Sequence, residues 1–345
     1  MPSANPTIRD VAALSGVSIG TVSAVLNRKD TVSDGTRERV LRAMSELHYR
    51  PSAAARRRLQ PTSAKSIGLI VKEVNNPYFA DIIFGAQEAA RELGYSVLVG
   101  HTERSHDLEQ QIADLLVAKD VDGLIINPLL NDGADRSHLA EIRWTNVPLV
   151  LIEGVEGVQA SVVDVDNVSA EQGVVEYLVG LGHQRIVHVA GPRYSTHSDE
   201  RVEGLRRAFA AAEMPVGGGT VIHAGAGLAD GYRAALDAFQ DGEPPTAVTC
   251  YNDLVAIGVM RALRELGLRV PEDVSVVGFD DIDVSGYLAT PLTTVRMPRR
   301  EIGRRATRML VEAVEAEGGM APQRVQLDTE LVVRASTAPP TEPGG

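Results

Sequence analysis

Short apolar runs alternate with helical patterns through most of this 345-residue chain. The runs are SIGLIV (66–71), YSVLVG (95–100), DGLIINP (122–128), PLVLIEG (148–154), RIVHVAG (185–191), AVTCYND (247–253) and VSVVGFDD (274–281). Strands that alternate with helices pair in parallel, so this pattern predicts an α/β fold with doubly wound parallel sheets. The series restarts near residue 185, which predicts two lobes with a ligand crevice at the carboxyl ends of the strands.

Composition excludes several other classes of protein. The single cysteine, Cys250, excludes an internal disulfide framework and a cysteine-based zinc site. The chain has no apolar run of about 18 residues and no signal-peptide pattern at its N-terminus. We therefore expect a cytoplasmic protein.

Charge is distributed unevenly along the chain. Residues 1–65 contain eleven Lys or Arg and five Asp or Glu, although the whole chain has a formal net charge of -12. A basic N-terminal part on an acidic body predicts that only the first part contacts a polyanion. Chance clustering of charges on a solvated surface is the alternative.

Three short helical patterns occupy the first 50 residues. The first runs from Thr7, as N-cap, to Leu14, and Ser18 caps the second after a break of about three residues. The third runs from Ser33 or Thr36 to about His48. The side chains expected in a shared core are Val22, Val25 and Leu26 of the second helix and Val40, Leu41, Met44 and Leu47 of the third. This spacing predicts a helix-turn-helix.

The second helix presents small and polar side chains outward. They are Ile19, Gly20, Thr21, Ser23, Ala24 and Asn27. Hydroxyl and amide groups donate to phosphate oxygens, and a helix N-terminus adds its own N–H groups. An uncharged surface of this kind can lie in the major groove of DNA. The alternative is a three-helix interaction module that is rich in Ser and Thr.

The stretch TIRDVAALSGVSIGTVSAVLN, followed by VSDGTRERVLRAMSELHYRPSAAARRRL, resembles the headpiece of the lactose-repressor (LacI/GalR) family of transcription factors. The similarity continues to residue 337. The resemblance implies DNA-backbone contacts by Thr21, Ser23, Asn27, Ser33 and Thr36, beside Ser18 at the helix N-terminus. It places Ile19, Gly20 and Ala24 at base-reading positions. Because these three offer little beyond apolar contact, we expect weak direct readout and more discrimination by DNA shape and the hinge.

The segment PSAAARRRLQ (51–60) is expected to form the family's hinge helix, which orders on DNA and enters the minor groove. The hinge positions are Ser52, Ala55, Arg56, Arg57, Arg58 and Leu59, with Leu59 as the wedge between base pairs. Counted from Pro51 the usual leucine position holds Arg58, whereas counted back from Ile67 it holds Leu59. One residue is therefore inserted relative to the family pattern. In the alternative, Leu59 packs against the body.

The resemblance also implies a body like a periplasmic sugar-binding protein, in which the chain crosses three times between lobes. We expect a headpiece over 1–50, a hinge over 51–65 and an effector and dimerisation domain over 66–337. Its first lobe would contain 66–166 and 296–322, its second 167–295 and 323–337, and 338–345 would be disordered. No leucine heptad follows the body, so a homodimer is expected rather than a tetramer.

Candidate effector residues follow the predicted strands. They are Tyr78, Phe79, Ser195, His197, Arg201, Asn252 and Asp280, with Arg201 matching an arginine that grips effector oxygens in many family members. A planar cation facing carboxylate and amide groups suits a polyhydroxylated ligand, so a sugar is expected. For Tyr78, His197 and Asn252 the alternative is hinge or core hydrogen bonding. An aromatic common among relatives is replaced by Ala226. We expect Arg201→Ala to abolish the ligand response and leave folding intact.

Two glycine- or acid-rich stretches have other interpretations. GAGLADG (225–231) lacks the lysine of a phosphate-binding loop and is interpreted as the turn before a helix. GFDDIDVS (278–285) is interpreted as strand-end acids at a sugar cleft, with magnesium binding as the alternative.

These features together predict a transcriptional repressor, associated with the bacterial nucleoid, that binds a pseudo-palindromic operator in double-stranded DNA as a homodimer. A small-molecule effector, either a sugar or alternatively a nucleoside or phosphorylated metabolite, would control it. We expect no cofactor, no metal, no catalytic residue and no membrane partner. The competing hypotheses are a cytosolic carbohydrate-binding protein without a DNA role and an α/β enzyme.

Overall fold

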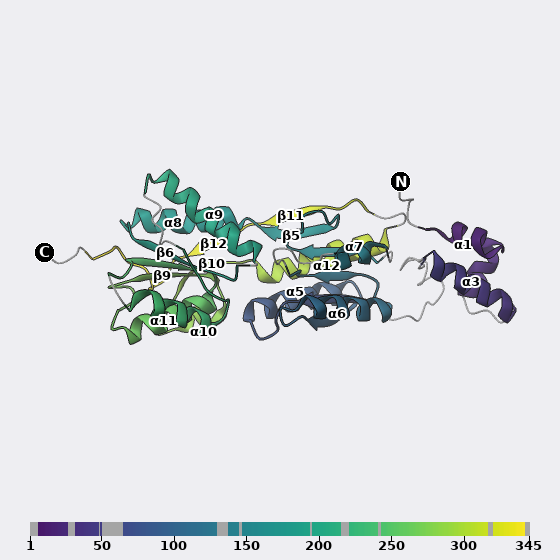
Figure 1. Ribbon diagram of the computed structural model, residues 1–345, viewed down its shortest axis with the longest axis horizontal. Helices are drawn as coiled ribbons and strands as arrows, with labels where there is room; N and C mark the ends of the chain where they lie inside the picture. Colours follow the sequence, from purple (N-terminus) through teal and green to yellow (C-terminus); the bar gives the residue numbers. More distant parts are fainter. Residues whose placement is uncertain are drawn as a thin grey trace.

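The protein is described by a computed structural model in which residues 6–26, 32–47, 49, 65–129, 137–144, 147–193, 195–214, 221–240, 243–316 and 320–341 are placed. Figure 1 shows three bodies in a row: a helical headpiece, a first α/β lobe and a second α/β lobe, with the C-terminus at the far end of the second lobe. No single described helix is long and apolar enough to cross a membrane, and only the bent pair formed by the first two helices passes that test together.

The headpiece contains α1 (Ile8–Ser15), α2 (Ile19–Leu26) and α3 (Asp34–Glu46). The helices start where the sequence predicts. The Asp10 carboxylate accepts the Thr7 N–H at 2.7 Å, and Ser18 Oγ accepts the Thr21 N–H at 3.1 Å. Gly16 ends α1 at φ 68°, a left-handed conformation that favours glycine. A short turn between two packed helices confirms the predicted helix-turn-helix arrangement.

Six side chains form the headpiece core, namely Val11, Ala12, Val22, Val25, Val40 and Ala43. One core prediction was wrong, because Leu41 is 52% exposed while Ala43 is buried. Met44 and Leu47 pack on the core only partly buried. A helix turns by 3.6 residues, so Val40 and Ala43 share the inner face of α3 and Leu41 lies off it.

The first lobe is built on a six-stranded parallel sheet in the order β11-β5-β4-β3-β1-β2. Its strands are β1 (Ser66–Val71), β2 (Ser96–His101), β3 (Leu124–Ile126), β4 (Leu149–Ile152), β5 (Ser161–Val165) and β11 (Arg324–Leu327). Its helices are α5 (Pro77–Glu92), α6 (His106–Ala118), α7 (Ser137–Trp144) and α12 (Arg299–Glu315). Gly85 of α5 and Gly303 of α12 let these two helices approach closely, because an added Cβ at either would meet the other helix's backbone.

The second lobe repeats this plan in the order β12-β10-β9-β8-β6-β7. Its strands are β6 (Ile186–Ala190), β7 (Val221–His223), β8 (Ala247–Cys250), β9 (Ser275–Asp280), β10 (Thr293–Arg296) and the antiparallel β12 (Glu330–Val332). Its helices are α8 (Asn167–Gly180), α9 (Thr196–Ala211), α10 (Leu228–Phe239), α11 (Asp253–Glu265) and the 3-10 helix η1 (Asp283–Tyr287). All six residues of β9 are buried, as expected of a parallel strand covered on both faces.

The structure corrects two predicted boundaries. Residues 324–327 were assigned to the second lobe, but β11 pairs in parallel with β5 and completes the first sheet. The third crossing therefore lies between Leu327 and Glu330. The tail was expected to be disordered from residue 338, yet Ala338 N–H donates to Ser275 Oγ at 3.1 Å and Ala338 O contacts His183 Nε2 at 2.9 Å. Residues 338–341 thus pack on the second lobe, and 342–345 lie outside the described residues.

Candidate functional site

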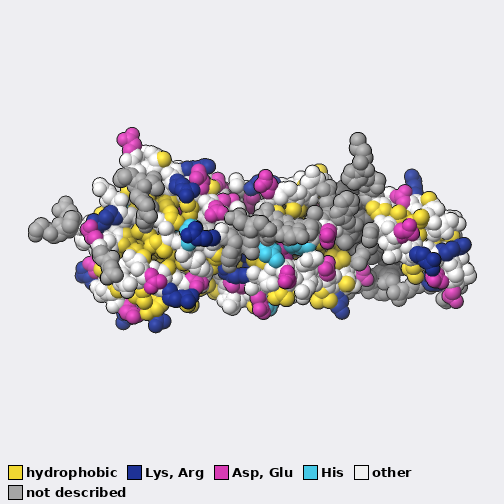
Figure 2. Space-filling model, in the orientation of Figure 1, with side chains coloured by type: hydrophobic (Ala, Val, Ile, Leu, Met, Phe, Trp, Pro, Cys, Tyr) yellow, Lys and Arg dark blue, Asp and Glu magenta, His cyan; other side chains and the backbone are white. Residues whose placement is uncertain are grey.

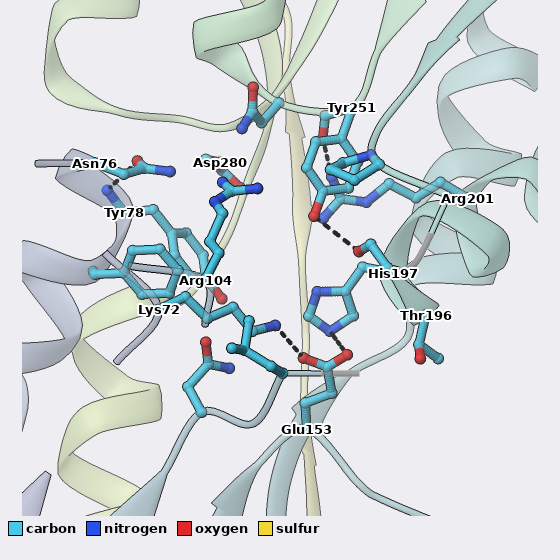
Figure 3. Close-up of a pocket in the computed structure, with 16 residues that line it drawn as sticks. Lys72, Asn76, Tyr78, Arg104, Glu153, Thr196, His197, Arg201, Tyr251 and Asp280 are labelled. Carbon is cyan, nitrogen blue, oxygen red and sulfur yellow. Dashed lines mark hydrogen bonds and ion pairs between the residues drawn. The ribbon is translucent and has the colours of Figure 1, made fainter. Parts of the chain in front are cut away.

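The order of strands in both sheets places their carboxyl ends around one crevice. In each sheet the winding reverses beside the first strand, between β1 and β3 and between β6 and β8, and ligand sites of open parallel sheets lie at such reversals. Lys72 follows β1 and Glu153 follows β4 in the first lobe, while Tyr251 follows β8 and Asp280 ends β9 in the second. Side chains from both lobes therefore meet between them (Figure 3).

A cavity of about 700 Å³, including the part open to solvent, occupies this crevice. It is lined by Lys72, Asn76, Tyr78, Phe79, Arg104, Asn127, Leu129, Glu153, Pro192, Ser195, Thr196, His197, Arg201, Tyr251, Asn252 and Asp280. All seven effector residues predicted from the sequence belong to this set. Small-molecule sites are mostly concave, with a few polar groups that converge on the ligand. The crevice has the chemistry of such a site.

Glu153 joins the two lobes. Lys72 Nζ of the first lobe lies 3.0 Å from Glu153 Oε2, and His197 Nε2 of the second lobe lies 3.1 Å from Glu153 Oε1 (Figure 3). The backbone of Glu153 has φ 88°, which is rare for a residue other than glycine. Residues held in such conformations concentrate at functional sites. Sequence analysis missed both Lys72 and Glu153.

Burial shifts the titration of this pair in opposite directions. Removal from water raises the pKa of Glu153, against the attraction of Lys72. Burial lowers the pKa of His197 well below its usual range, and the positive charges of Lys72 and Arg201 lower it further. His197 is therefore neutral near pH 7, and its Nε2–H can donate to the Glu153 carboxylate.

Arg201 of α9 is 3% exposed and is fixed on several sides. Its Nε and NH2 groups donate to Asn167 Oδ1 at 3.2 and 3.1 Å, and NH1 donates to the carbonyl oxygen of Tyr251. The guanidinium also stacks on the Phe279 ring, 3.5 Å from its centroid. Arg201 lines the cavity as predicted, but it also holds α8, α9 and the end of β8 together.

Asp280 carries a carboxyl group into the cavity from the end of β9. It is 6% exposed and has φ 117°. Burial raises its pKa to about 8, against the attraction of Arg201. Among the described residues, no hydrogen bond or ion pair engages its carboxyl group. A ligand hydroxyl is therefore the kind of partner that this group lacks.

The neighbouring carboxyls are already occupied. Asp253 accepts the Ile282 N–H at 2.8 Å and the Thr294 hydroxyl at 2.6 Å, and burial raises its pKa to about 7. Asp281 does not line the cavity and pairs with Arg296 and Arg334. In the described part of the chain, no three His, Cys, Asp or Glu side chains gather as they do around a metal ion.

Several predicted residues serve the scaffold as well as the cavity. Asn252 caps α11 through its Oδ1, which accepts the Val255 N–H at 2.8 Å, and its Nδ2 donates to Ala226 O at 3.0 Å. The Asn252 amide group therefore both accepts and donates a hydrogen bond within the protein, in agreement with the alternative of core hydrogen bonding. Ser195 caps α9 and its Oγ lies 3.1 Å from Tyr251 Oη.

The aromatic pair follows the first strand as predicted. The rings of Tyr78 and Phe79 meet edge to face, with centroids 5.0 Å apart. Burial raises the pKa of Tyr78, so its hydroxyl stays neutral. Both rings begin helix α5, which Asn76 caps by accepting the Tyr78 N–H at 3.0 Å. The pair forms an apolar wall of the cavity.

Sequence analysis missed the polar cavity residues Lys72, Asn76, Arg104, Asn127, Glu153, Thr196 and Tyr251. Asn127 follows β3, and its Nδ2 donates to Ile152 O at 3.0 Å. Its buried Oδ1 accepts no hydrogen bond from the described residues. Arg104 forms a two-pronged ion pair with Glu73 at 2.5 and 3.0 Å. Position just after a buried strand was the one signal that pointed to several of these residues.

The headpiece exposes the predicted DNA-facing residues of α2. Ile19 is 46% exposed, Ser18 and Gly20 are exposed, and Thr21, Ser23 and Ala24 are half-buried. Two hydroxyl pairs mark the helix N-termini: Ser18 Oγ lies 2.9 Å from Thr21 Oγ1, and Ser33 Oγ donates to Thr36 Oγ1 at 3.0 Å. Asn27 lies outside the described residues. Hydroxyls and free N–H groups at two helix starts suit phosphate oxygens.

The basic charge of the N-terminal part lies mostly beyond the packed helices. Figure 2 shows Lys and Arg beside Asp and Glu on the headpiece. The described headpiece contains four basic residues, Arg9, Arg37, Arg39 and Arg42, and four acidic ones, Asp10, Asp34, Glu38 and Glu46. The excess positive charge of residues 1–65 therefore comes from 27–31 and 50–65. The hinge positions Ser52, Ala55, Arg56, Arg57, Arg58 and Leu59 all fall outside the described residues, and their predictions stay open.

A helix-turn-helix headpiece joined to a two-lobed body with a polar cavity defines a ligand-responsive DNA-binding protein. Residues 7–52 match the bacterial regulatory proteins of the lacI family, and residues 175–337 match the periplasmic binding protein-like domain. The chain is 34% identical over 332 residues to the HTH-type transcriptional repressor PurR of Haemophilus influenzae (strain PittEE), covering 96% of this chain and 98% of that one. It is 32% identical over 335 residues to PurR of Photobacterium profundum, covering 96% and 98%.

Solved structures agree with this assignment. The transcriptional regulator CelR–cellobiose complex matches with a TM-score of 0.71 and 34% identity over 96% of this chain and 99% of that one. The lac repressor dimer bound to operator and the anti-inducer ONPF matches with a TM-score of 0.71 and 31% identity over 97% and 100%. The chain belongs to the LacI family. The predictions of family, fold class and a DNA-binding transcriptional regulator rather than an enzyme are confirmed.

Proposed function

We propose that this regulator is a homodimeric repressor whose operator affinity is set by a neutral carbohydrate bound between its lobes. Two headpieces would contact the half-sites of a near-palindromic operator in double-stranded DNA. The effector would occupy the cavity lined by Asp280, Glu153 and Arg201. No cofactor or metal takes part.

The charge balance of the cavity is the observation that favours a neutral ligand. Each of its three cations already has partners: Lys72 pairs with Glu153, Arg104 with Glu73, and Arg201 with Asn167 Oδ1 and the Tyr251 carbonyl. A phosphate group would have to compete with these partners while lying near the Glu153 carboxylate.

A polyhydroxylated ligand meets the same groups without this conflict. Its hydroxyls can donate to Asp280 and to the buried Oδ1 of Asn127, which lack partners among the described residues. The Tyr78–Phe79 wall suits the apolar C–H face of a sugar ring. A similar regulator, CelR, has been solved as a complex with cellobiose, which supports the same ligand class here.

A nucleoside is the second candidate, and the aromatic pair favours it. The rings of Tyr78 and Phe79 could contact the face or edge of a flat base. The many polar cavity groups around them favour the sugar, because a base offers fewer hydroxyls to satisfy them.

The dimer and the coupling rest on the two-lobed plan. The lac repressor, similar over 97% of this chain, has been solved as a dimer bound to operator. Here Glu153 of the first lobe contacts His197 of the second across the cavity. A ligand that adds or replaces contacts across this gap would favour one lobe arrangement over another and so alter the spacing of the two headpieces.

A thermal-shift panel on the full-length protein tests this proposal. We expect neutral sugars to raise the melting temperature and their phosphate esters to act more weakly, because ligands that bind only the folded state stabilise it. Nucleosides form the comparison arm. Stabilisation by sugar phosphates or nucleosides alone would contradict the proposed ligand class.

A further inference from the structure

A second hollow opens directly from the effector cavity. It is lined by Glu73, Asn75, Asn76, Arg104, Pro192, Arg193, Ala224, Gly225, Ala226, Gly227, Leu228, Asp230 and Leu254. Asn76, Arg104 and Pro192 line both spaces, so the two are continuous. We call this second space the outer groove. It measures about 1270 Å³ including the part open to solvent, and its walls come from both lobes.

One wall of the outer groove consists of very small residues that are held in place. Residues 225–227 are Gly-Ala-Gly, and they precede helix α10. Asp230 Oδ2 accepts the Gly227 N–H at 3.1 Å, and a Cβ added at Gly225 would collide with the same carboxyl group. Ala226 between the two glycines carries only a methyl group and is 4% exposed, so this wall adds little bulk to the groove.

The outer groove also offers the mixed chemistry that a sugar unit needs. Leu228 is 50% exposed at the start of α10, although it is a large apolar residue. On the opposite side the Glu73–Arg104 ion pair and Asn75 supply polar groups. Sugar rings have an apolar C–H face and a rim of hydroxyls, so an apolar patch opposite polar side chains matches one further ring.

We propose that the effector is a saccharide of at least two units, with one unit in the inner cavity and the next in the outer groove. This inference rests on the proposed carbohydrate function of the same site. The inner unit contacts Asp280 and the groups around Glu153, and the connecting bond passes Asn76 and Arg104, which line both spaces. A monosaccharide would leave the outer groove filled with water.

Calorimetric titration of the full-length protein tests the proposal with defined sugars. Glucose, galactose and xylose are compared with cellobiose, maltose, lactose and xylobiose, and then with the corresponding trisaccharides. We expect at least one disaccharide to bind about tenfold or more tightly than each of its component monosaccharides.

Two variants locate the second unit. Leu228→Trp adds bulk at an exposed site in the groove and is expected to weaken the disaccharide about tenfold while leaving a monosaccharide unchanged. Leu14→Ala and Leu228→Ala form a matched pair, because Leu14 is similarly exposed, at 46%, but lies in the headpiece. Only Leu228→Ala should weaken the disaccharide.

The outcomes separate the two proposals. If a monosaccharide binds as tightly as every disaccharide and Leu228→Trp changes nothing, the two-unit effector is wrong while the carbohydrate function stands. If no saccharide binds at all, both fail.

Discussion

The strongest single test of the cavity's electrostatics is the substitution Asp280→Asn. The carboxyl group of Asp280 is 6% exposed, and burial raises its pKa from the ordinary 3.8 to about 8. In the unfolded chain this group loses its proton near pH 4, whereas in the folded protein it keeps the proton until about pH 8. Over that interval the folded state binds more protons, so the free energy of unfolding falls as the pH rises.

The size of the effect follows from the linkage slope of about 1.4 kcal/mol for each proton and each pH unit. At about pH 6 nearly the full slope applies, because almost every folded molecule still carries the proton. At about pH 8, the pKa of Asp280 in the folded protein, half of the slope remains. Asp280 should therefore remove about 2 kcal/mol of stability from the wild type over this range. Asparagine has no such titration, so the variant should be less sensitive to pH by about this amount.

Urea unfolding followed by circular dichroism at about pH 6 and pH 8 measures the difference. Protein concentration must be held fixed, because an oligomer's apparent stability depends on it. Asp283→Asn is the matched control, since this nearby carboxylate is 96% exposed in its side chain. Equal pH dependence in wild type and Asp280→Asn would show that the carboxyl group is not held protonated, and would refute the reasoning.

Two further substitutions test other parts of the account. From the sequence, Arg201→Ala was expected to leave folding intact. The buried contacts of Arg201 with Asn167 and Phe279 instead predict that the free energy of unfolding in urea falls by about 3–5 kcal/mol and that the effector response is lost. A decrease below about 1 kcal/mol would contradict this. Gly20→Ala should stabilise the headpiece by up to about 1 kcal/mol in thermal unfolding, because the new Cβ meets nothing closer than Ser18 Oγ at 3.6 Å; a destabilised headpiece would contradict the helix geometry.

Much of the cavity could be predicted because its residues follow buried strands. Parallel strands present their carboxyl ends together, so Ser195, Arg201 and Asp280 could be grouped without knowing the fold in detail. Lys72 and Glu153 follow strands in the same way but were missed. A single charged residue after a strand looks like an ordinary surface residue. Only the strand order, in which β3 alone separates β1 from β4, shows that the two side chains meet.

The wrong boundaries have a common cause, which is that pairing between distant segments leaves little local signal. Residues 324–327 alternate between exposed and half-buried positions, so nothing nearby indicates that they pair with β5. The ordered tail is fixed by Ser275 and His183, which lie far away in the sequence. The prediction that Leu41 is buried was wrong for a different reason. It rested on the apolar residue type, whereas the position of the residue around the helix axis determines its exposure.

The central claim is that a ligand bound in the cavity between the lobes changes the affinity of the headpieces for DNA. Fluorescence anisotropy of a fragment from the region upstream of the protein's own coding sequence, titrated with the full-length protein at several fixed effector concentrations, measures this coupling directly. We predict that a saturating effector concentration changes the affinity for DNA. Because of linkage, bound DNA must change the affinity for the effector by the same factor. Tight DNA binding that stays the same at every effector concentration, for a ligand shown by calorimetry to occupy the cavity, would contradict the account.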